Sequence, residues 1–304
     1  MHNVKAVHRR KYLLLHFLIF LWGFTAVLGK LVSLDALNLT WYRLGLAVAA
    51  LALWRLWRRR PAHYTWRDYR LFVFNGILIA LHWTAFFGAI KLGNVSTTLI
   101  ALSSGAFFAS LLEPLIYGRR VDYKEIWLGL LILGGIAYLF GISQVHFWAF
   151  LTAIAAAFLS ALFSVWNGLL IRRYPALDLS FYELASGFGL LTLILVFTGQ
   201  WIPPAAVPPA DWIWILLLAL VCTAYSFTVS LDLLRYINPF TLILSLNLEP
   251  VYGMILARII FGESEKMNGR FYIGSAIILG IVLLNNYLKL RKMTGPAENG
   301  PSEN

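Results

Sequence analysis

Apolar runs recur along this chain nearly from one end to the other. Each run is about 20 residues long, and a helix of that length spans ~30 Å of hydrocarbon at 1.5 Å per residue. Hydrophobic residues make up 60% of the sequence and charged residues only 13%, which is not the composition of a soluble domain. Bounding charges, Pro and Gly separate ten runs, at 12–31, 37–57, 69–90, 95–117, 126–142, 147–171, 179–198, 212–234, 239–261 and 271–288. The sequence predicts an all-α membrane protein with ten transmembrane helices.

The distribution of basic residues predicts how these helices are oriented. If the N-terminus lies inside, nineteen Lys and Arg fall in segments on the cytoplasmic side and five at the opposite ends, with Arg43 inside a span. Lys and Arg are enriched in the cytoplasmic loops of membrane proteins. We therefore expect a multi-pass protein of the inner or plasma membrane with both termini in the cytoplasm. The same distribution assigns the net charge of +11 to membrane orientation rather than to nucleic-acid binding.

The two halves of the chain repeat one another. An offset of 144 residues pairs Thr97 with Thr241 and Gly118 with Gly262. Because each half holds an odd number of spans, five, the halves enter the membrane in opposite directions. We expect two inverted five-helix repeats at 12–142 and 146–290, between a cytoplasmic tail at 1–11 and a disordered tail at 291–304. Inverted repeats are the architecture of alternating-access transporters, whose substrate site lies near mid-membrane.

The ninth run contains a carboxylate at membrane depth. Glu249 lies about ten residues, or ~15 Å, from either end of its helix, and a charge there costs roughly 2.5 to 3.5 kcal/mol on insertion scales. Pro250 also removes one backbone hydrogen bond from this helix. We interpret Glu249 as a residue that handles substrate or protons, because burial disfavours the charged form of a carboxyl. The alternative is a structural, buried ion pair.

Three further polar or aromatic candidates lie in the second and third spans. Arg43 is either a snorkelling side chain or an anchor for a substrate carboxylate or phosphate. His82 is either a hydrogen-bonding packing residue or a proton relay, and Trp83 follows it in the centre of the third span. By contrast, the sequence places Glu183 near the inner end of its span, where a carboxylate at the interface is the simpler interpretation.

The remaining candidates are aromatic and amide side chains within the spans. Aromatic side chains could line a cavity for an amphipathic solute, and amides can hydrogen-bond within it or between helices. These substrate-binding candidates are Trp22, Trp166, Asn167, Tyr225, Asn247 and Tyr252. The sequence shows no metal-ligand cluster, nucleotide-binding loop or hydrolase motif, so we predict no cofactor, no metal and no enzymatic activity.

Four short motifs resemble those of a known family. They are W-G-F-T at 22–25, Y-R-L-G-L-A at 42–47, L-N-L-E-P at 246–250 and F-G-E at 261–263. Their order, the repeat and the ten spans resemble the drug/metabolite transporter superfamily, specifically its EamA-type ten-helix permeases. The resemblance implies export, or less often import, of small metabolites through a central cavity lined by helices one to four and six to nine. Helices five and ten would be peripheral.

These features together predict a secondary transporter, an exporter of a small organic metabolite such as an amino acid, working by alternating access. Two alternatives remain open at this point. One is a polytopic membrane enzyme acting on a lipid-linked substrate, which would need acidic or His residues clustered at one membrane surface. The other is a passive facilitator or channel. The expected partners are the lipid bilayer and a small molecule; a monomer is compatible with the sequence, which does not set the oligomeric state.

Overall fold

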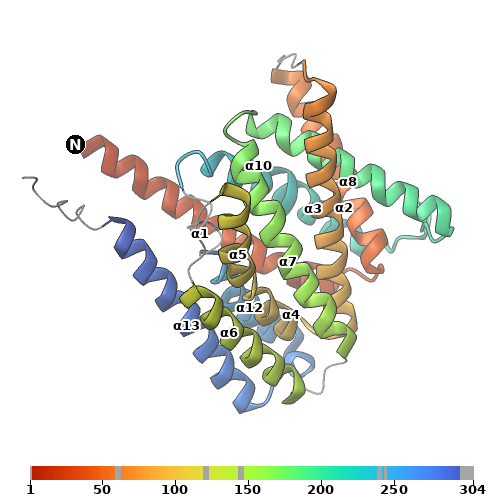
Figure 1. Ribbon diagram of the computed structural model, residues 1–304. Coiled ribbons are helices and arrows are strands. Elements are labelled where there is room, and N and C mark those ends of the chain that lie inside the picture. Colours follow the sequence, from red (N-terminus) through yellow and green to blue (C-terminus); the bar gives the residue numbers. More distant parts are fainter. Residues whose placement is uncertain are drawn as a thin grey trace, which may run out of the picture.

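The structure is a computed structural model that describes residues 2–58, 63–118, 123–142, 147–237, 242 and 245–294. Its first half consists of α1 (His2–Leu31), α2 (Ala36–Arg58), α3 (Trp66–Leu92), α4 (Val95–Leu102), α5 (Gly105–Tyr117) and α6 (Tyr123–Ile142). Its second half consists of α7 (Phe147–Leu170), α8 (Ala176–Thr198), η1 (Pro204–Ala206), α9 (Pro209–Leu216), η2 (Leu217–Tyr225), α10 (Ser226–Leu233), α12 (Glu249–Phe261), η3 (Gly262–Glu265) and α13 (Gly269–Thr294). Within the described ranges every regular element is helical, which confirms the predicted all-α class (Figure 1).

Seven helical segments in the described part of the chain are long and apolar enough to cross a membrane. They are Leu13–Leu31, Ala36–Arg58, Trp66–Leu92, Val95–Tyr117, Phe147–Leu170, Ala176–Thr198 and Pro209–Leu233. The other three expected spans correspond to α6, to α12 and to α13, whose apolar stretches are shorter or partly outside the described residues. The helix α1 begins at His2 and α13 continues to Thr294, so both helices extend into the segments that we expected to be tails.

Some sequence expectations fall on residues outside the described ranges. These are the basic residues at 59–60 and 119–120, the boundary between the repeats at 143–146, the start of the ninth span at 239, and the tail from 295 onward.

Two membrane helices are interrupted at equivalent places. The fourth span turns at Ser103 and Ser104, between α4 and α5, and the ninth turns at Asn247 and Leu248, before α12. The helices after the two turns begin at residues 105 and 249, which are separated by the repeat offset of 144. We expected a break only in the ninth span, caused by Pro250. The break in the ninth span is present, and the fourth span breaks as well without a proline there, so a proline is not required for such a turn.

Local hydrogen bonds explain both interruptions better than the proline does. The N–H of Ser104 bonds to the oxygen of Ala101 at 3.0 Å, and the N–H of Leu248 bonds to that of Ser245 at 3.0 Å, so both turns tighten to the i−3 pattern. The Ser104 hydroxyl also donates to the carbonyl oxygen of Ala101 at 2.7 Å, so it competes with backbone N–H groups for that acceptor. Pro250 lies in the first turn of α12, where the absent N–H costs nothing.

The eighth span is irregular in a different way. It runs as α9, then the π-helical segment η2, then α10. The hydroxyls of Thr223 and Ser226 donate to carbonyls five residues earlier, at Leu218 and Val221, both at 2.7 Å. π-Helical segments within α-helices are frequent at functional sites, because they reorient side chains that would otherwise follow the α-helical period.

Glycines allow close helix crossings beside the interrupted helices. A Cβ at Gly23 in α1 would lie 3.1 Å from the Glu249 carbonyl oxygen in α12. A Cβ at Gly76 in α3 would lie only 2.2 Å from the Glu183 carbonyl oxygen in α8. Small residues at such crossings let helix backbones approach in membrane proteins. Both crossings bring a carboxylate-bearing residue into the middle of the bundle.

One end of the bundle, which we call the Lys30 end, is held by buried carboxylates. Glu265 accepts hydrogen bonds from Lys30 Nζ at 2.7 Å, from the Val95 N–H at 2.9 Å and from the Ser96 N–H at 3.1 Å. Its carboxylate therefore caps the N-terminus of α4. Asp211 accepts from the N–H and the hydroxyl of Ser33. These bonds join the first half of the chain to the second.

The opposite end of α2 defines the Arg55 end. Arg55 Nε donates to Asp178 at 2.7 Å, and the Tyr64 hydroxyl donates to the other oxygen of Asp178 at 2.7 Å. The Tyr174 hydroxyl donates to Asp68 at 2.5 Å. Burial, aided by this bond, raises the pKa of Tyr174 to about 12, so its phenol remains a donor at neutral pH. Bonds across the two halves thus close this end as well.

The helices α6 and α13 lie on one flank of the bundle, where they pack against each other (Figure 1). Their contact is part of a separate apolar cluster that contains Ile132, Ile136, Phe271 and Ile278. None of the described side chains that line the central cavity comes from these two helices. The main apolar core instead joins α1, α2, α3, α8 and α10.

Candidate functional site

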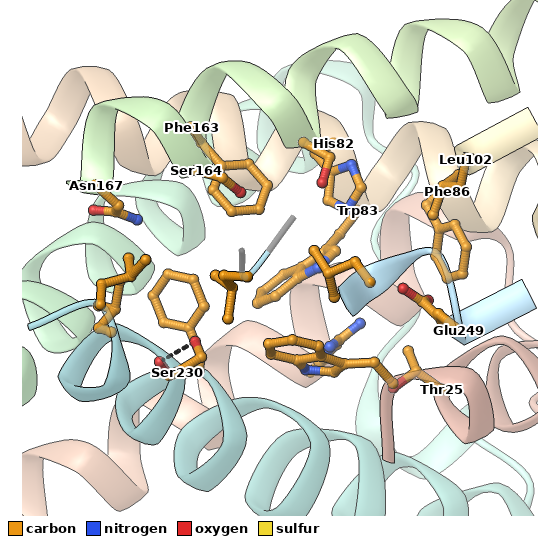
Figure 2. Close-up of a pocket in the computed structure, with 18 residues that line it drawn as sticks. Thr25, His82, Trp83, Phe86, Leu102, Phe163, Ser164, Asn167, Ser230 and Glu249 are labelled. Carbon is orange, nitrogen blue, oxygen red and sulfur yellow. Dashed lines mark hydrogen bonds between the residues drawn. The ribbon is translucent and has the colours of Figure 1, made fainter. Parts of the chain in front are cut away.

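A cavity lies inside the bundle and is lined by both halves of the chain. Its volume is about 90 Å³, several times what one water molecule needs. The lining residues come from α1, α2, α3, α4, α7, α10 and α12 and the segments beside them (Figure 2). They are Trp22, Thr25, Arg43, His82, Trp83, Phe86, Leu102, Ser160, Phe163, Ser164, Asn167, Phe227, Ser230, Leu231, Leu234, Leu242, Leu246 and Glu249. In Figure 2, Asn167 and Glu249 lie at opposite ends of the group.

Aromatic rings form much of the wall. The rings of Trp83 and Phe227 lie 6.2 Å apart and edge to face, and the ring of Phe163 lies 6.5 Å from that of Phe227. Trp22 and Phe86 complete this surface. Such walls favour a solute with an apolar part, and their faces also attract cations.

Arg43 supplies a positive charge to the cavity. Contacts hold one edge and one face of its guanidinium group. Its Nε donates to the Thr223 hydroxyl at 2.5 Å, and its guanidinium carbon lies 4.0 Å from the centre of the Trp83 ring. Thr223 belongs to η2, so the π-helical segment places the acceptor. Within the described residues Nη1 of this nearly buried side chain has no hydrogen-bond partner. Arg43 does not snorkel; one edge of its guanidinium remains available.

Glu249 supplies a negative charge to the same cavity. It is the first residue of α12, so its side chain enters from the interruption of the ninth span. Figure 2 shows Glu249 on the cavity wall together with Thr25 and Phe86. The ion pairs found among the described residues, such as Lys30–Glu265 and Arg55–Asp178, include neither Arg43 nor Glu249. Two opposite charges therefore line one cavity without pairing within 4 Å.

His82 lines the cavity with one ring nitrogen already engaged. Nδ1 lies 2.7 Å from the carbonyl oxygen of Ala156, so this nitrogen carries the proton and donates. The ring stacks on Phe86, with centroids 6.1 Å apart. Its geometry matches the packing interpretation, and Nε2 remains as an acceptor.

Asn167 connects the cavity to a second carboxylate. Its Nδ2 donates to Glu183 Oε2 at 3.3 Å, and Asn75 Nδ2 donates to Glu183 Oε1 at 2.8 Å. Glu183 is fully buried. Our expectation that Glu183 lies at the interface is wrong, because the glycine crossing at Gly76 draws α8 against α3 and places this residue inside the bundle.

Of the ten substrate-binding candidates, the structure brings six together around the cavity: Trp22, Arg43, His82, Trp83, Asn167 and Glu249. The other four lie elsewhere. Trp166 packs on Phe74 at a shallow outer depression, and Tyr225 is 42% exposed on the outside of η2. Asn247 is buried in the turn before α12, and Tyr252 packs on Phe20, where neither ring lines the cavity.

Several lining residues were not among the candidates. On α7, Ser160, Phe163 and Ser164 stand at positions i, i+3 and i+4, and the candidate Asn167 stands at i+7, so all four share one helix face. That spacing, anchored on Asn167, is a signal that the sequence already contains. Thr25 and Ser230 carry no comparable signal, since isolated hydroxyls in membrane helices serve packing as often as binding.

A bundle of long apolar helices, interrupted where they meet a charged internal cavity, defines a multi-pass membrane protein of the transporter class. The EamA-like transporter family matches this chain twice, at residues 9–141 and 147–287, and the chain belongs to that family. A protein of Archaeoglobus fulgidus described as an uncharacterized transporter is 23% identical over 289 residues, which cover 91% of this chain and 98% of that protein. A crystal structure with 18% identity matches with a TM-score of 0.65, covering 94% of this chain and 99% of that one, and shows the same fold.

Proposed function

We propose that this EamA-type transporter exports a small zwitterionic metabolite such as an amino acid by alternating access. The observation that carries the proposal is that two opposite charges, Arg43 and Glu249, line one aromatic cavity without forming an ion pair within 4 Å. A solute that brings one charge of each sign would satisfy both without leaving a net charge in the membrane interior.

The geometry suggests a binding mode. The free Nη1 edge of Arg43 would receive the substrate carboxylate, because a guanidinium forms charge-assisted bonds with planar anions. Glu249 would receive the ammonium group, and the aromatic wall of Trp83, Phe163 and Phe227 would contact the substrate side chain. The cavity of about 90 Å³ suits a small solute and requires an opening motion to admit it.

Two features support alternating access. Bonds between the halves of the chain hold both the Lys30 end and the Arg55 end, so exchange with either side requires the halves to move apart. The interrupted helices α4/α5 and α12 are related by the repeat offset, as expected for inverted repeats around a central site. Export across the inner or plasma membrane, with both termini in the cytoplasm, follows from the family resemblance and from the distribution of Lys and Arg.

Glu249 also offers a route for proton coupling. One carboxylate cannot hold an ammonium group and a proton at the same time, so the two compete for it. Proton entry from the outside would release substrate from Glu249, which is the logic of an exchanger. Proteoliposome transport that ignores a pH gradient, together with normal transport by Glu249→Gln, would exclude this coupling.

Transport of labelled amino acids by purified protein in proteoliposomes tests the proposal. We expect saturable exchange that Arg43→Gln and Glu249→Gln each reduce by about tenfold or more, since charge-assisted bonds contribute roughly 1.5 to 3 kcal/mol. Arg258→Gln on the same helix α12 is the matched control, because Arg258 pairs with the exposed Glu263 away from the cavity. Absence of transport for all amino acids, or equal loss in the control, would contradict the proposal; flux without saturation would indicate a channel.

A further inference from the structure

Glu183 is a second buried carboxylate, and substrate binding as proposed above does not use it. It lies where α3, α7 and α8 meet, with no exposed surface. Among the described residues, the hydrogen bonds to its two oxygens come from the amides of Asn75 and Asn167. A charged carboxylate in such a place is costly without a cation, and the usual resolution is that it binds a proton.

The charged and titratable groups on the packed helices do not supply that cation. In the described part of the chain, α2 presents Arg43, which bonds to Thr223, and Arg55, which pairs with Asp178. The helix α3 presents His82, whose Nδ1–H donates a hydrogen bond to the carbonyl oxygen of Ala156. Asp232 on α10 pairs with Arg235, which lies just beyond that helix. None of these groups bonds to Glu183.

The amide oxygens around Glu183 point to a second state of the site. Oδ1 of Asn75 and Oδ1 of Asn167 are buried and have no hydrogen-bond partner among the described residues. Ser180, one turn earlier on α8, has a buried hydroxyl that also has no hydrogen-bond partner among the described residues. A charged carboxylate only accepts hydrogen bonds, so it cannot satisfy an oxygen. A protonated carboxyl carries one O–H, and a half-turn of either amide would place an oxygen to accept it.

We propose that Glu183, held between Asn75 and Asn167, is a proton-binding site of the carrier, and that Asn167 links its protonation to the substrate cavity. The inference rests on the proposed transport function only for this link. A hydronium ion that enters the cavity gives its proton to Glu183: one O–H bond of the hydronium breaks, one O–H bond forms on the carboxylate, and a neutral water molecule remains. The neutral carboxyl then accepts less strongly from Asn167, which frees that amide to turn toward a solute in the cavity.

Infrared difference spectroscopy of the purified full-length protein tests the site without any transport assay. A change of pH should produce a carboxylic-acid C=O band that Glu183→Gln removes and Glu249→Gln retains. If every carboxylic-acid band survives in Glu183→Gln, the proposal is wrong. Because this measurement needs no substrate, it stands even when no amino acid proves to be transported.

A second variant covers the case in which Glu183→Gln does not fold. Asn75→Leu keeps Glu183 but removes the N–H bonded to Oε1. The C=O band of Glu183 should then move to higher frequency, because the carboxyl loses a hydrogen bond. A band at the wild-type position would contradict the placement of the proton between these side chains.

Transport assays test the link to the cavity. In proteoliposomes, Glu183→Gln should retain exchange of substrate at equal pH but lose accumulation driven by a pH gradient by about tenfold or more. Accumulation driven by a sodium gradient at equal pH, and abolished in Glu183→Gln, would overturn the assignment to a proton. Accumulation that responds to the pH gradient as in the wild type would overturn the link.

Discussion

At the scale of single residues, the cavity depends on how one arginine is held. Arg43 donates a hydrogen bond from Nε to Thr223, and its guanidinium face contacts the ring of Trp83. Nη1, which has no partner among the described residues, can then bind a ligand. A buried guanidinium needs this support, because any of its N–H groups left without a partner costs free energy. Thr223 can reach Arg43 because η2 shifts the phase of the eighth span. The sequence showed the charge at 43 but not its acceptor, which comes from another span.

Removal of the Thr223 hydroxyl should therefore impair the site. We expect Thr223→Val to lower stability by about 1 to 3 kcal/mol, because Arg43 Nε would lose its buried acceptor, and to weaken substrate binding. Thr228→Val is the matched control: its hydroxyl is buried without a partner among the described residues, so its loss should be neutral or stabilising. Thermal unfolding in detergent measures both, and equal melting temperatures of the two variants would refute the role given to Thr223.

At the scale of elements, glycine crossings position both carboxylates. Gly23 lets α1 approach α12 at Glu249, and Gly76 lets α3 approach α8 at Glu183. Neither contact can be predicted from the sequence of one helix alone, because each depends on which other helix packs against it. This explains why Glu249, whose depth can be counted along its own span, was predicted as a buried polar residue, whereas Glu183 was assigned to the interface.

A methyl group at Gly76 should be poorly tolerated. The added Cβ would lie 2.2 Å from the Glu183 carbonyl oxygen, and backbone cannot yield as a side chain can. We expect Gly76→Ala to separate α3 from α8 and to lower stability by about 1 to 3 kcal/mol or more. At Gly189, which lies within α8, the partner helix at this crossing, the same change meets open space and should stabilise by about 0.5 to 1 kcal/mol. Melting temperatures compare the pair; a tolerated Gly76→Ala would mean that the crossing is looser than described.

At the scale of the whole molecule, the sequence predicted what depends on periodicity and missed what depends on contact. Run lengths predicted the helices, and the helix starts at residues 105 and 249 agree with the 144-residue offset, although the sequence did not predict that a helix begins at residue 105. The interruption at Ser103 and Ser104 was missed, because hydroxyls that bond to their own backbone look like ordinary packing residues in a sequence. The contacts that hold the two ends, such as Lys30 with Glu265, span more than 200 residues and leave no local pattern.

The Glu265 contacts lead to a prediction about the balance of states. Glu265 binds Lys30 and caps α4 across the two halves, so Glu265→Gln should loosen the Lys30 end and favour a carrier open there. Glu263→Gln, two residues away, is the control. Hydrogen bonds from Lys266 and Arg258 lower the pKa of Glu263, so its contribution is present at pH 7 and is lost only as pH falls through that lowered value. Because Glu263 is exposed, that contribution is small.

Thiol labelling can measure this opening. Cys222 is the only cysteine of the chain, so a Cys222→Ala background with Thr25→Cys places a single thiol on the cavity. A membrane-impermeant reagent added on the Lys30 side should label this thiol several-fold faster in Glu265→Gln than in the parent, because opening that end exposes the α1 wall. Glu263→Gln should label at the parental rate. Equal rates in all three proteins would show that the Glu265 contacts do not hold the Lys30 end closed.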